Sequence, residues 1–196
     1  MANKINFSGI LTISGSPGTG KATLIASLLQ CVPNSVQSTC VTTCTSHDPK
    51  NVYRYISEDE FRIWQCQGKL FYPEEDGEVK NSMLRSEIDE VLAGDEKKLI
   101  IIESPYYKVE LLRNYATGKG KESLIRSVFL DPTGDVYEMH RRMLERGDSE
   151  AQAKMNSVDC CNLSTQARTA PVDFRFVNAL HSKAVVLDEV LSLLCE

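Results

Sequence analysis

Gly15-Ser16-Pro17-Gly18-Thr19-Gly20-Lys21-Ala22-Thr23 lies between an apolar run and a helical pattern. Residues 9–14, before it, have the composition of a buried strand. Residues 22–31, after it, carry leucine and isoleucine at helical spacing. A strand, a glycine-rich turn and a helix therefore follow one another in the order that a phosphate-binding loop needs.

The residue types in this loop suit an anionic ligand. Glycines at three positions let backbone N–H groups turn inward, and the start of the helix adds the positive end of its dipole. Lys21 then lies where the β- and γ-phosphates of a nucleotide would be. The alternative, a turn that only joins a strand to a helix, would not require this lysine. We therefore expect the loop to bind nucleotide phosphates through Ser16, Gly18, Thr19, Gly20, Lys21, Ala22 and Thr23.

The position after the lysine usually carries the Mg²⁺-binding hydroxyl, but here it is Ala22, and the hydroxyl follows at Thr23. The loop resembles those of nucleoside monophosphate kinases, among which adenylate kinases also have a small residue after the lysine. In that group the metal is held largely through water. The resemblance thus implies ATP and Mg²⁺ as cofactors, with Thr23 on the metal side.

Composition and charge restrict the class of partner. The chain has 196 residues, 42% of them hydrophobic, which suits one domain with a sizeable core. A net charge of −5 argues against nucleic acid or an anionic membrane as partner, and no run approaches the roughly 20 apolar residues of a membrane span. The seven cysteines have no metal-like spacing and are expected to be reduced. These features predict a soluble, cytoplasmic protein that binds small-molecule nucleotides.

The pattern along the chain alternates between strands and helices. Leu99–Glu103 is a continuous apolar run ending in an acid, as expected for a strand buried on both faces, with Glu103 at the edge where α/β sheets bind ligands. Ser57 and Glu60 predict a capping box at the start of a helix. Further strands are expected at 36–45, 52–56, 70–72, 124–130 and 174–178, an acidic loop at 73–78, and helices at 58–67, 81–93, 109–115, 135–146 and 181–195, with 147–169 helical in part. Met139, Met143 and Leu144 are expected to point inward. The alternation predicts an α/β fold with a parallel sheet covered on both faces.

This order of elements resembles the guanylate kinase family over nearly the whole chain. Besides the loop, the resemblance is carried by Val41-Thr42-Thr43, by Tyr53-Arg54-Tyr55-Ile56-Ser57-Glu58-Asp59-Glu60-Phe61, by Arg142-Met143-Leu144-Glu145-Arg146-Gly147 and by Asp173-Phe174-Arg175-Phe176-Val177-Asn178. It implies a single P-loop domain with a core of about residues 1–35, 82–135 and 170–196. It also implies an inserted monophosphate-binding β subdomain at about 36–81 and a helical lid at about 136–169.

The resemblance further implies transfer of the γ-phosphoryl group of ATP to GMP, giving ADP and GDP. Lys21 and the loop amides would hold the ATP phosphates, and Asn178 would lie near the adenine. Arg142 and Arg146, one helical turn apart, would clamp the transferring group from the lid. The alternative for these two arginines is an exposed helix face with solvated charges.

The acceptor side departs from the family pattern. A serine and two arginines that reach the monophosphate in the family correspond here to Cys40, Cys44 and His47. Tyr72 stands where the family has the acid that reads guanine, and Glu103 begins the pair that replaces Asp-x-Asp. Tyr53 matches the family as a phosphate-binding hydroxyl, or else only packs in its strand. These six positions are the predicted acceptor-binding residues.

Three functions stay open at this point. The first is a guanylate kinase with an altered acceptor pocket. The second is a kinase of a different phosphate acceptor, since the donor half is retained while the acceptor half is rewritten. The third is a catalytically impaired module that binds nucleotide or a protein partner.

Overall fold

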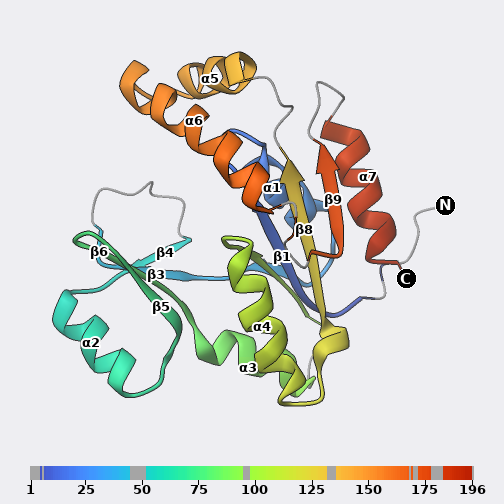
Figure 1. Ribbon diagram of the computed structural model, residues 1–196. Coiled ribbons are helices and arrows are strands. Elements are labelled where there is room, and N and C mark those ends of the chain that lie inside the picture. The colour runs from blue at the N-terminus through green and yellow to red at the C-terminus, as the bar shows by residue number, and fades with distance from the viewer. Residues whose placement is uncertain are drawn as a thin grey trace.

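The computed structural model describes residues 5, 7–44, 52–94, 98–131, 136–167, 169, 172–177 and 183–195. Within these ranges the main sheet has five parallel strands, in the order β2-β7-β1-β8-β9 (Figure 1). They are β1 (Gly9–Gly15), β2 (Ser35–Gln37), β7 (Leu99–Glu103), β8 (Ile125–Asp131) and β9 (Phe174–Val177). The predicted α/β fold with a parallel sheet flanked by helices is confirmed.

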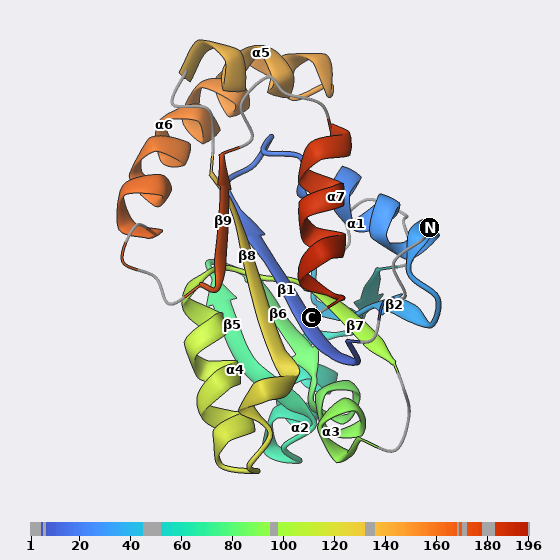
Figure 2. The same cartoon turned by 90° about the vertical axis from the view of Figure 1, so that its right-hand side faces the viewer.

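Both faces of this sheet are buried, as the continuous apolar strands predicted. Leu11 and Ile101 pack on one face with α1 (Lys21–Cys31) and α7 (Lys183–Leu193). Ile10 and Ile100, one residue out of phase, pack on the other face with α3 (Arg85–Ala93) and α4 (Tyr107–Thr117). Figure 2 shows α1 and α7 together on one side of β1. With both faces covered by helices, the carboxyl ends of the parallel strands are left to meet at one edge of the sheet.

A second sheet lies beside the first, with strand order β4-β3-β6-β5 (Figure 1). Its strands are β3 (Cys40–Thr42), β4 (Tyr53–Tyr55), β5 (Leu70–Asp76) and β6 (Val79–Leu84). One face packs against α2 (Glu58–Cys66), where Val41, Phe61 and Leu70 form a small core. The predicted capping box begins α2, because Ser57 Oγ accepts from the Glu60 amide at 3.2 Å and the Ser57 amide donates to the Glu60 carboxylate at 3.3 Å.

The single strand predicted at 36–45 is wrong. The chain leaves the main sheet after β2 and joins the second sheet at β3. At the crossing, Ser38 Oγ and the Thr39 amide both donate to the Glu87 carboxylate, at 2.8 and 3.0 Å. The sequence does not reveal the passage from one sheet to the other, because the alternation of side chains along a β-branched run continues while the partner strand changes.

The acidic loop predicted at 73–78 is also wrong, and the helix predicted at 81–93 begins later. Residues 73–76 continue β5 and pair with β6, which extends to Leu84, so α3 begins only at Arg85. Glu75 and Lys80 face each other across this hairpin, with 3.5 Å between their charged atoms. Opposite charges at paired positions of two strands stabilise a hairpin that composition alone presents as a solvated loop.

Two further helices follow β8: the first lies beyond the end toward which the β8 arrowhead points in Figure 1, and the second runs back from there toward the middle of the molecule (Figure 2). They are α5 (Val136–Glu145) and α6 (Glu150–Ala167), and a short 3₁₀ turn, η1 (Glu122–Leu124), precedes β8. Met139 and Met143 are buried against Ala153, as predicted for the two methionines. Leu144 was expected inward but is 37% exposed, because it lies one position past the buried stripe. None of the helices in the described ranges is long and apolar enough to cross a membrane.

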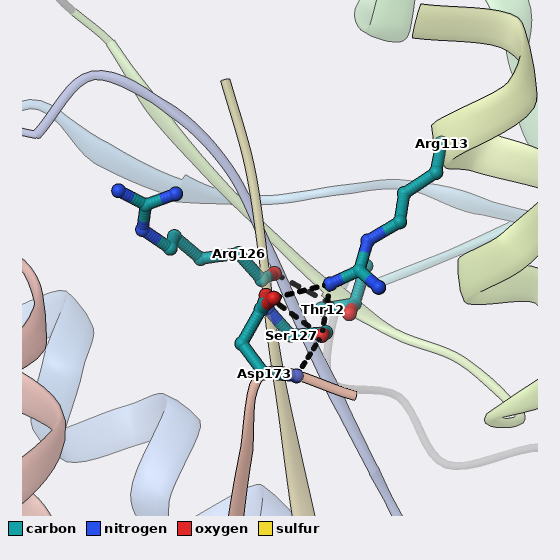
Figure 3. Close-up of polar contacts among 5 residues, drawn as sticks. All are labelled: Thr12, Arg113, Arg126, Ser127 and Asp173. Carbon is teal, nitrogen blue, oxygen red and sulfur yellow. Dashed lines mark hydrogen bonds and ion pairs between the residues drawn. The ribbon is translucent and has the colours of Figure 1, made fainter. Parts of the chain in front are cut away.

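The outer strand β9 is attached to its neighbours by a polar network (Figure 3). The Asp173 carboxylate accepts from the amide and hydroxyl of Ser127, at 2.8 and 2.9 Å, and pairs with the Arg113 guanidinium. Ser127 Oγ in turn accepts from the Asp173 amide at 2.8 Å. The network joins α4, β8 and the start of β9, which fixes the strand that follows α6.

Candidate nucleotide-binding site

The loop between β1 and α1 is shaped by its glycines. Gly18 and Gly20 have φ angles of 78° and 90°, a region that side chains disfavour. At Gly15 a Cβ atom would lie 2.5 Å from the backbone oxygen of Leu130, so the adjacent strand excludes any side chain there. Thr19 Oγ donates to the Ser16 carbonyl at 2.7 Å and closes the turn. The loop therefore has the tight form that an anion-binding backbone needs.

Lys21 is held at the base of this loop. Its Nζ donates to the carbonyls of Gly15 and Ser16, at 2.9 and 3.0 Å, and lies 3.5 Å from the Glu103 carboxylate. Glu103 is there because β7 pairs in parallel with β1, with Ile13 opposite Glu103. The ammonium is mostly buried, with 14% of the side chain exposed. The start of α1 and the end of β7 thus bring a cation and a carboxylate together beside the loop.

A cavity of about 960 Å³ opens next to Lys21, between the loop and the second sheet. Ala22 and Glu103 line it on the side of the main sheet. Cys40 and Tyr53 line it on the side of the second sheet. The site therefore places two of the predicted acceptor residues opposite the predicted phosphate loop.

Strand pairing explains why Cys40 and Tyr53 face the cavity together. They are opposite each other in β3 and β4, so their side chains share a face of the sheet. Arg54, the next residue, lies on the other face, where its guanidinium stacks over Trp64 with 4.6 Å to the ring centroid.

Burial raises the pKa of the Cys40 thiol, although the nearby Lys108 acts in the opposite direction. This cysteine is consequently protonated at neutral pH.

The sequence did not point to three further residues of the cavity, Glu74, Tyr107 and Lys108. Lys108 Nζ lies 2.8 Å from the Glu74 carboxylate, and only 7% of this lysine side chain is exposed. The Tyr107 hydroxyl donates to the same carboxylate at 2.8 Å. Burial and this hydrogen bond raise the pKa of Tyr107 to about 12. A hydrogen-bonded ion pair therefore forms the wall opposite Lys21.

A bulge in β5 accounts for the missed carboxylate. The pairing with β6 shifts between Phe71 and Glu74, and Tyr72 has a left-handed φ of 48°. Tyr72 is 41% exposed and is not part of the described cavity wall, whereas Glu74 is. A carboxylate therefore lines the cavity two residues after Tyr72. Pro73 was the available signal, because proline inside a strand often marks a bulge.

The structure does not bring every predicted site residue to the cavity. As far as the described residues define it, the wall includes neither Arg142 nor Arg146. Arg142 Nε donates to Glu138 at 2.7 Å, and Arg146 pairs with Asp148. Thr23 is exposed and Cys44 is half-buried, both away from the described wall, while His47 and Asn178 lie outside the described residues.

The donor set fits a magnesium ion that is carried by nucleotide phosphates. In the described part of the chain, no three His, Cys, Asp or Glu side chains are grouped to hold a metal by themselves. Mg²⁺ keeps several waters and binds largely through substrate phosphates in nucleotide sites, so it does not need a cluster of protein ligands here.

Comparisons with known proteins agree with this fold. No protein-family model matches the sequence, and no curated protein matches it. The crystal structure of guanylate kinase from Anaplasma phagocytophilum is similar, with a TM-score of 0.58 and 18% identity over 96% of this chain and 85% of that chain. A gluconokinase from Sinorhizobium meliloti gives a TM-score of 0.48 and 12% identity over 97% of this chain and 93% of that chain. The likeness to the guanylate kinase shows that the two chains share a fold.

Proposed function

We propose that this chain is an ATP-dependent kinase of a small acceptor. The observation that carries the proposal is the position of Lys21, at the base of a glycine loop and at the mouth of a cavity of about 960 Å³. A glycine turn with only a structural role would have no need for a buried ammonium facing a cavity. The cavity has room for an acceptor beside the phosphates.

Lys21 would bind the β- and γ-phosphates together with the loop amides. Its present partners are two backbone carbonyls and the Glu103 carboxylate, so the ammonium is already held near its working position. Mg²⁺ bound with ATP supplies charge neutralisation for the transferring group. The residues of this chain supply positioning, since phosphoryl transfer needs little covalent help from the protein.

GMP is the acceptor that the guanylate kinase resemblance implies, in the reaction of ATP and GMP to ADP and GDP. Tyr53 and Glu74, which line the cavity, are the groups that would meet its phosphate and its base. Cys44 and His47 replace two guanidinium groups of the family, each worth about 1.5–3 kcal/mol as a charged hydrogen bond. Their loss would weaken binding of the monophosphate by on the order of a hundredfold or more.

The helices α5 and α6 are proposed as the lid of this kinase. Closure would bring Arg142 and Arg146 toward the transferring phosphoryl group and exclude water. The proposed division is a core of about 1–35, 82–135 and 170–196, an acceptor-binding subdomain of about 36–81 and a lid of about 136–169. Asn178 is proposed to lie near the adenine.

A second candidate is a module that binds nucleotide or a protein partner without catalysis. It is favoured by the contacts of Arg142 with Glu138 and of Arg146 with Asp148, which engage both predicted clamp residues within or beside their own helix. In this case ATP would bind and no acceptor would be phosphorylated.

The test measures ADP formed from ATP and Mg²⁺ by the full chain, with and without a mixture of nucleosides and nucleoside monophosphates. We expect acceptor-dependent ADP formation that Lys21→Met lowers by about 10- to 150-fold, the equivalent of a lost charged hydrogen bond. Lys98→Met is the matched control, because Lys98 precedes β7 at the far end from Glu103 and pairs only with the exposed Glu90 among the described residues. Equal rates for wild type and Lys21→Met, or no acceptor-dependent rate in wild type, would refute the kinase.

A further inference from the structure

We infer that the acceptor is an uncharged hydroxyl compound, a nucleoside, and that Glu103 takes the proton from its hydroxyl group. This inference rests on the proposed kinase function and names the acceptor of the same cavity. It follows from the charges on the cavity wall and from the position of Glu103.

The charges on the described wall cancel. Its charged side chains are Lys21, Lys108, Glu74 and Glu103. Once the ATP phosphates engage Lys21, one cation remains against two carboxylates. That cation, Lys108, is 2.8 Å from Glu74 and almost fully buried. Before the proposed lid closes, a monophosphate dianion would therefore meet net negative charge on the described wall beside the phosphates of ATP, whereas an uncharged acceptor meets no such repulsion.

A hydroxyl acceptor needs a base, and Glu103 is in position to be one. The oxygens of a monophosphate are already ionised at neutral pH, but an alcohol must lose its proton as it attacks. The Glu103 carboxylate is 3.5 Å from Lys21 Nζ and therefore within reach of a phosphoryl group bound there. Its side chain is 42% exposed and lines the cavity.

The step balances with ATP as the only co-reactant. The hydroxyl oxygen of the acceptor forms a bond to the γ-phosphorus, while its proton passes to the Glu103 carboxylate. The bond from the γ-phosphorus to the β,γ-bridging oxygen breaks, and ADP leaves with the electron pair. Kinases with hydroxyl acceptors use a carboxylate in this role.

Two features of the wall suit the base of a nucleoside. Tyr53 and Tyr106 line the cavity, are half-buried and offer aromatic faces for stacking. The Glu74 carboxylate accepts from Lys108 and Tyr107, which leaves further lone pairs for the N–H donors of a base. A carboxylate held rigidly by two partners is a suitable acceptor for a heteroaromatic amine.

The experiment measures label transfer from [γ-³²P]ATP by the full chain to four matched pairs: guanosine and GMP, adenosine and AMP, cytidine and CMP, uridine and UMP. For at least one pair we expect kcat/KM for the nucleoside to exceed that for its monophosphate by about tenfold or more. A preference for the monophosphates would overturn the inference. No labelling of either set, with ATP still bound in a Lys21-dependent manner, would also overturn it and would leave the nucleotide site standing. If the chain does not bind ATP, the proposed kinase function is refuted as well as the choice of acceptor.

Two variants test the assigned groups. Glu103→Gln should lower kcat by about a hundredfold or more, with KM for ATP changed less than about threefold. Recovery of this rate when Mg²⁺ is raised from about 2 to about 20 mM would show that Glu103 holds the metal, and the base assignment would fail.

Glu74→Gln leaves the Lys108 ammonium without its carboxylate and should shift the preference toward the monophosphate by about tenfold. Glu75→Gln is the matched control, because Glu75 is the next residue of β5, is 61% exposed and pairs with Lys80. An equal shift in both variants, or none in Glu74→Gln, would contradict the charge argument.

Discussion

Lys21 Nζ lies close to several oxygen atoms. They include two carbonyls of its own loop and a carboxylate from β7. The local sequence predicts the loop because glycines and the lysine are adjacent in it. The neighbouring carboxylate was also predicted, since acids at strand ends gather at one edge of a parallel sheet.

Glu74 and Lys108 could not be predicted in the same way. The bulge at Tyr72 moves the useful carboxylate two positions along β5, and Lys108 approaches it from α4, far away in the sequence. A lysine at the start of a helix normally counts as a solvated charge. Only the folded chain shows that it is buried and paired.

At the residue scale, α5 should respond to acid through Glu138. Hydrogen bonds from Arg141 and Arg142 lower the pKa of Glu138 to about 2, from an ordinary value of 4.5. A lowered pKa in the folded state means that the carboxylate stabilises the fold above pH 4.5 and that this stabilisation is lost as the pH falls toward 2. The thermal midpoint of Glu138→Gln should therefore lie below that of wild type at pH 7, and the two should converge near pH 2.

Glu189→Gln serves as the control, because Glu189 is an exposed residue of α7. Its midpoint should follow wild type at both pH values. A difference between Glu138→Gln and wild type that stays the same from pH 7 to pH 2 would contradict the assigned pairing.

At the scale of elements, local sequence patterns predicted the strands and helix starts that short-range signals define. They missed the strands whose bounds depend on pairing with distant segments. β7 is a continuous apolar run, and the start of α2 is a capping box, so both were confirmed. The division of residues 35–42 between β2 and β3 was not predicted, because it depends on Glu87 in α3. β6 was missed for a similar reason, since its partners are β3 and β5.

The crossing between the two sheets should depend on Glu87. Its carboxylate accepts from Ser38 Oγ and the Thr39 amide, and Ser38 is buried. Glu87→Ala leaves both donors without this acceptor, which should lower the free energy of unfolding by about 1–3 kcal/mol. Glu87→Gln keeps an amide oxygen and should cost less. Both are measured by urea unfolding.

Glu90→Ala is the control for this measurement. Glu90 also lies in α3, but it is exposed and pairs with Lys98 at the surface. Its loss should change the free energy of unfolding by less than about 0.5 kcal/mol. Equal losses in Glu87→Ala and Glu90→Ala would mean that the crossing is held by other contacts.

At the scale of the whole molecule, the site exists because two sheets meet. Lys21 and Glu103 come from the main sheet and its first helix, Cys40 and Glu74 from the second sheet, and Lys108 from α4. The order of strands and helices predicted the main sheet. It could not predict the charge balance of the cavity, which depends on how the second sheet faces the first and on the bulge within it.

Calorimetric titration of ATP with Mg²⁺ into the full chain and into Lys21→Met tests the central claim most directly. We expect one site per chain in the wild type and affinity weaker by about 10- to 150-fold in the variant, with the thermal midpoint of the variant unchanged within about 2 °C. Equal affinity in both proteins, or no binding by a folded wild-type chain, would contradict the claim that this cavity is a nucleotide site.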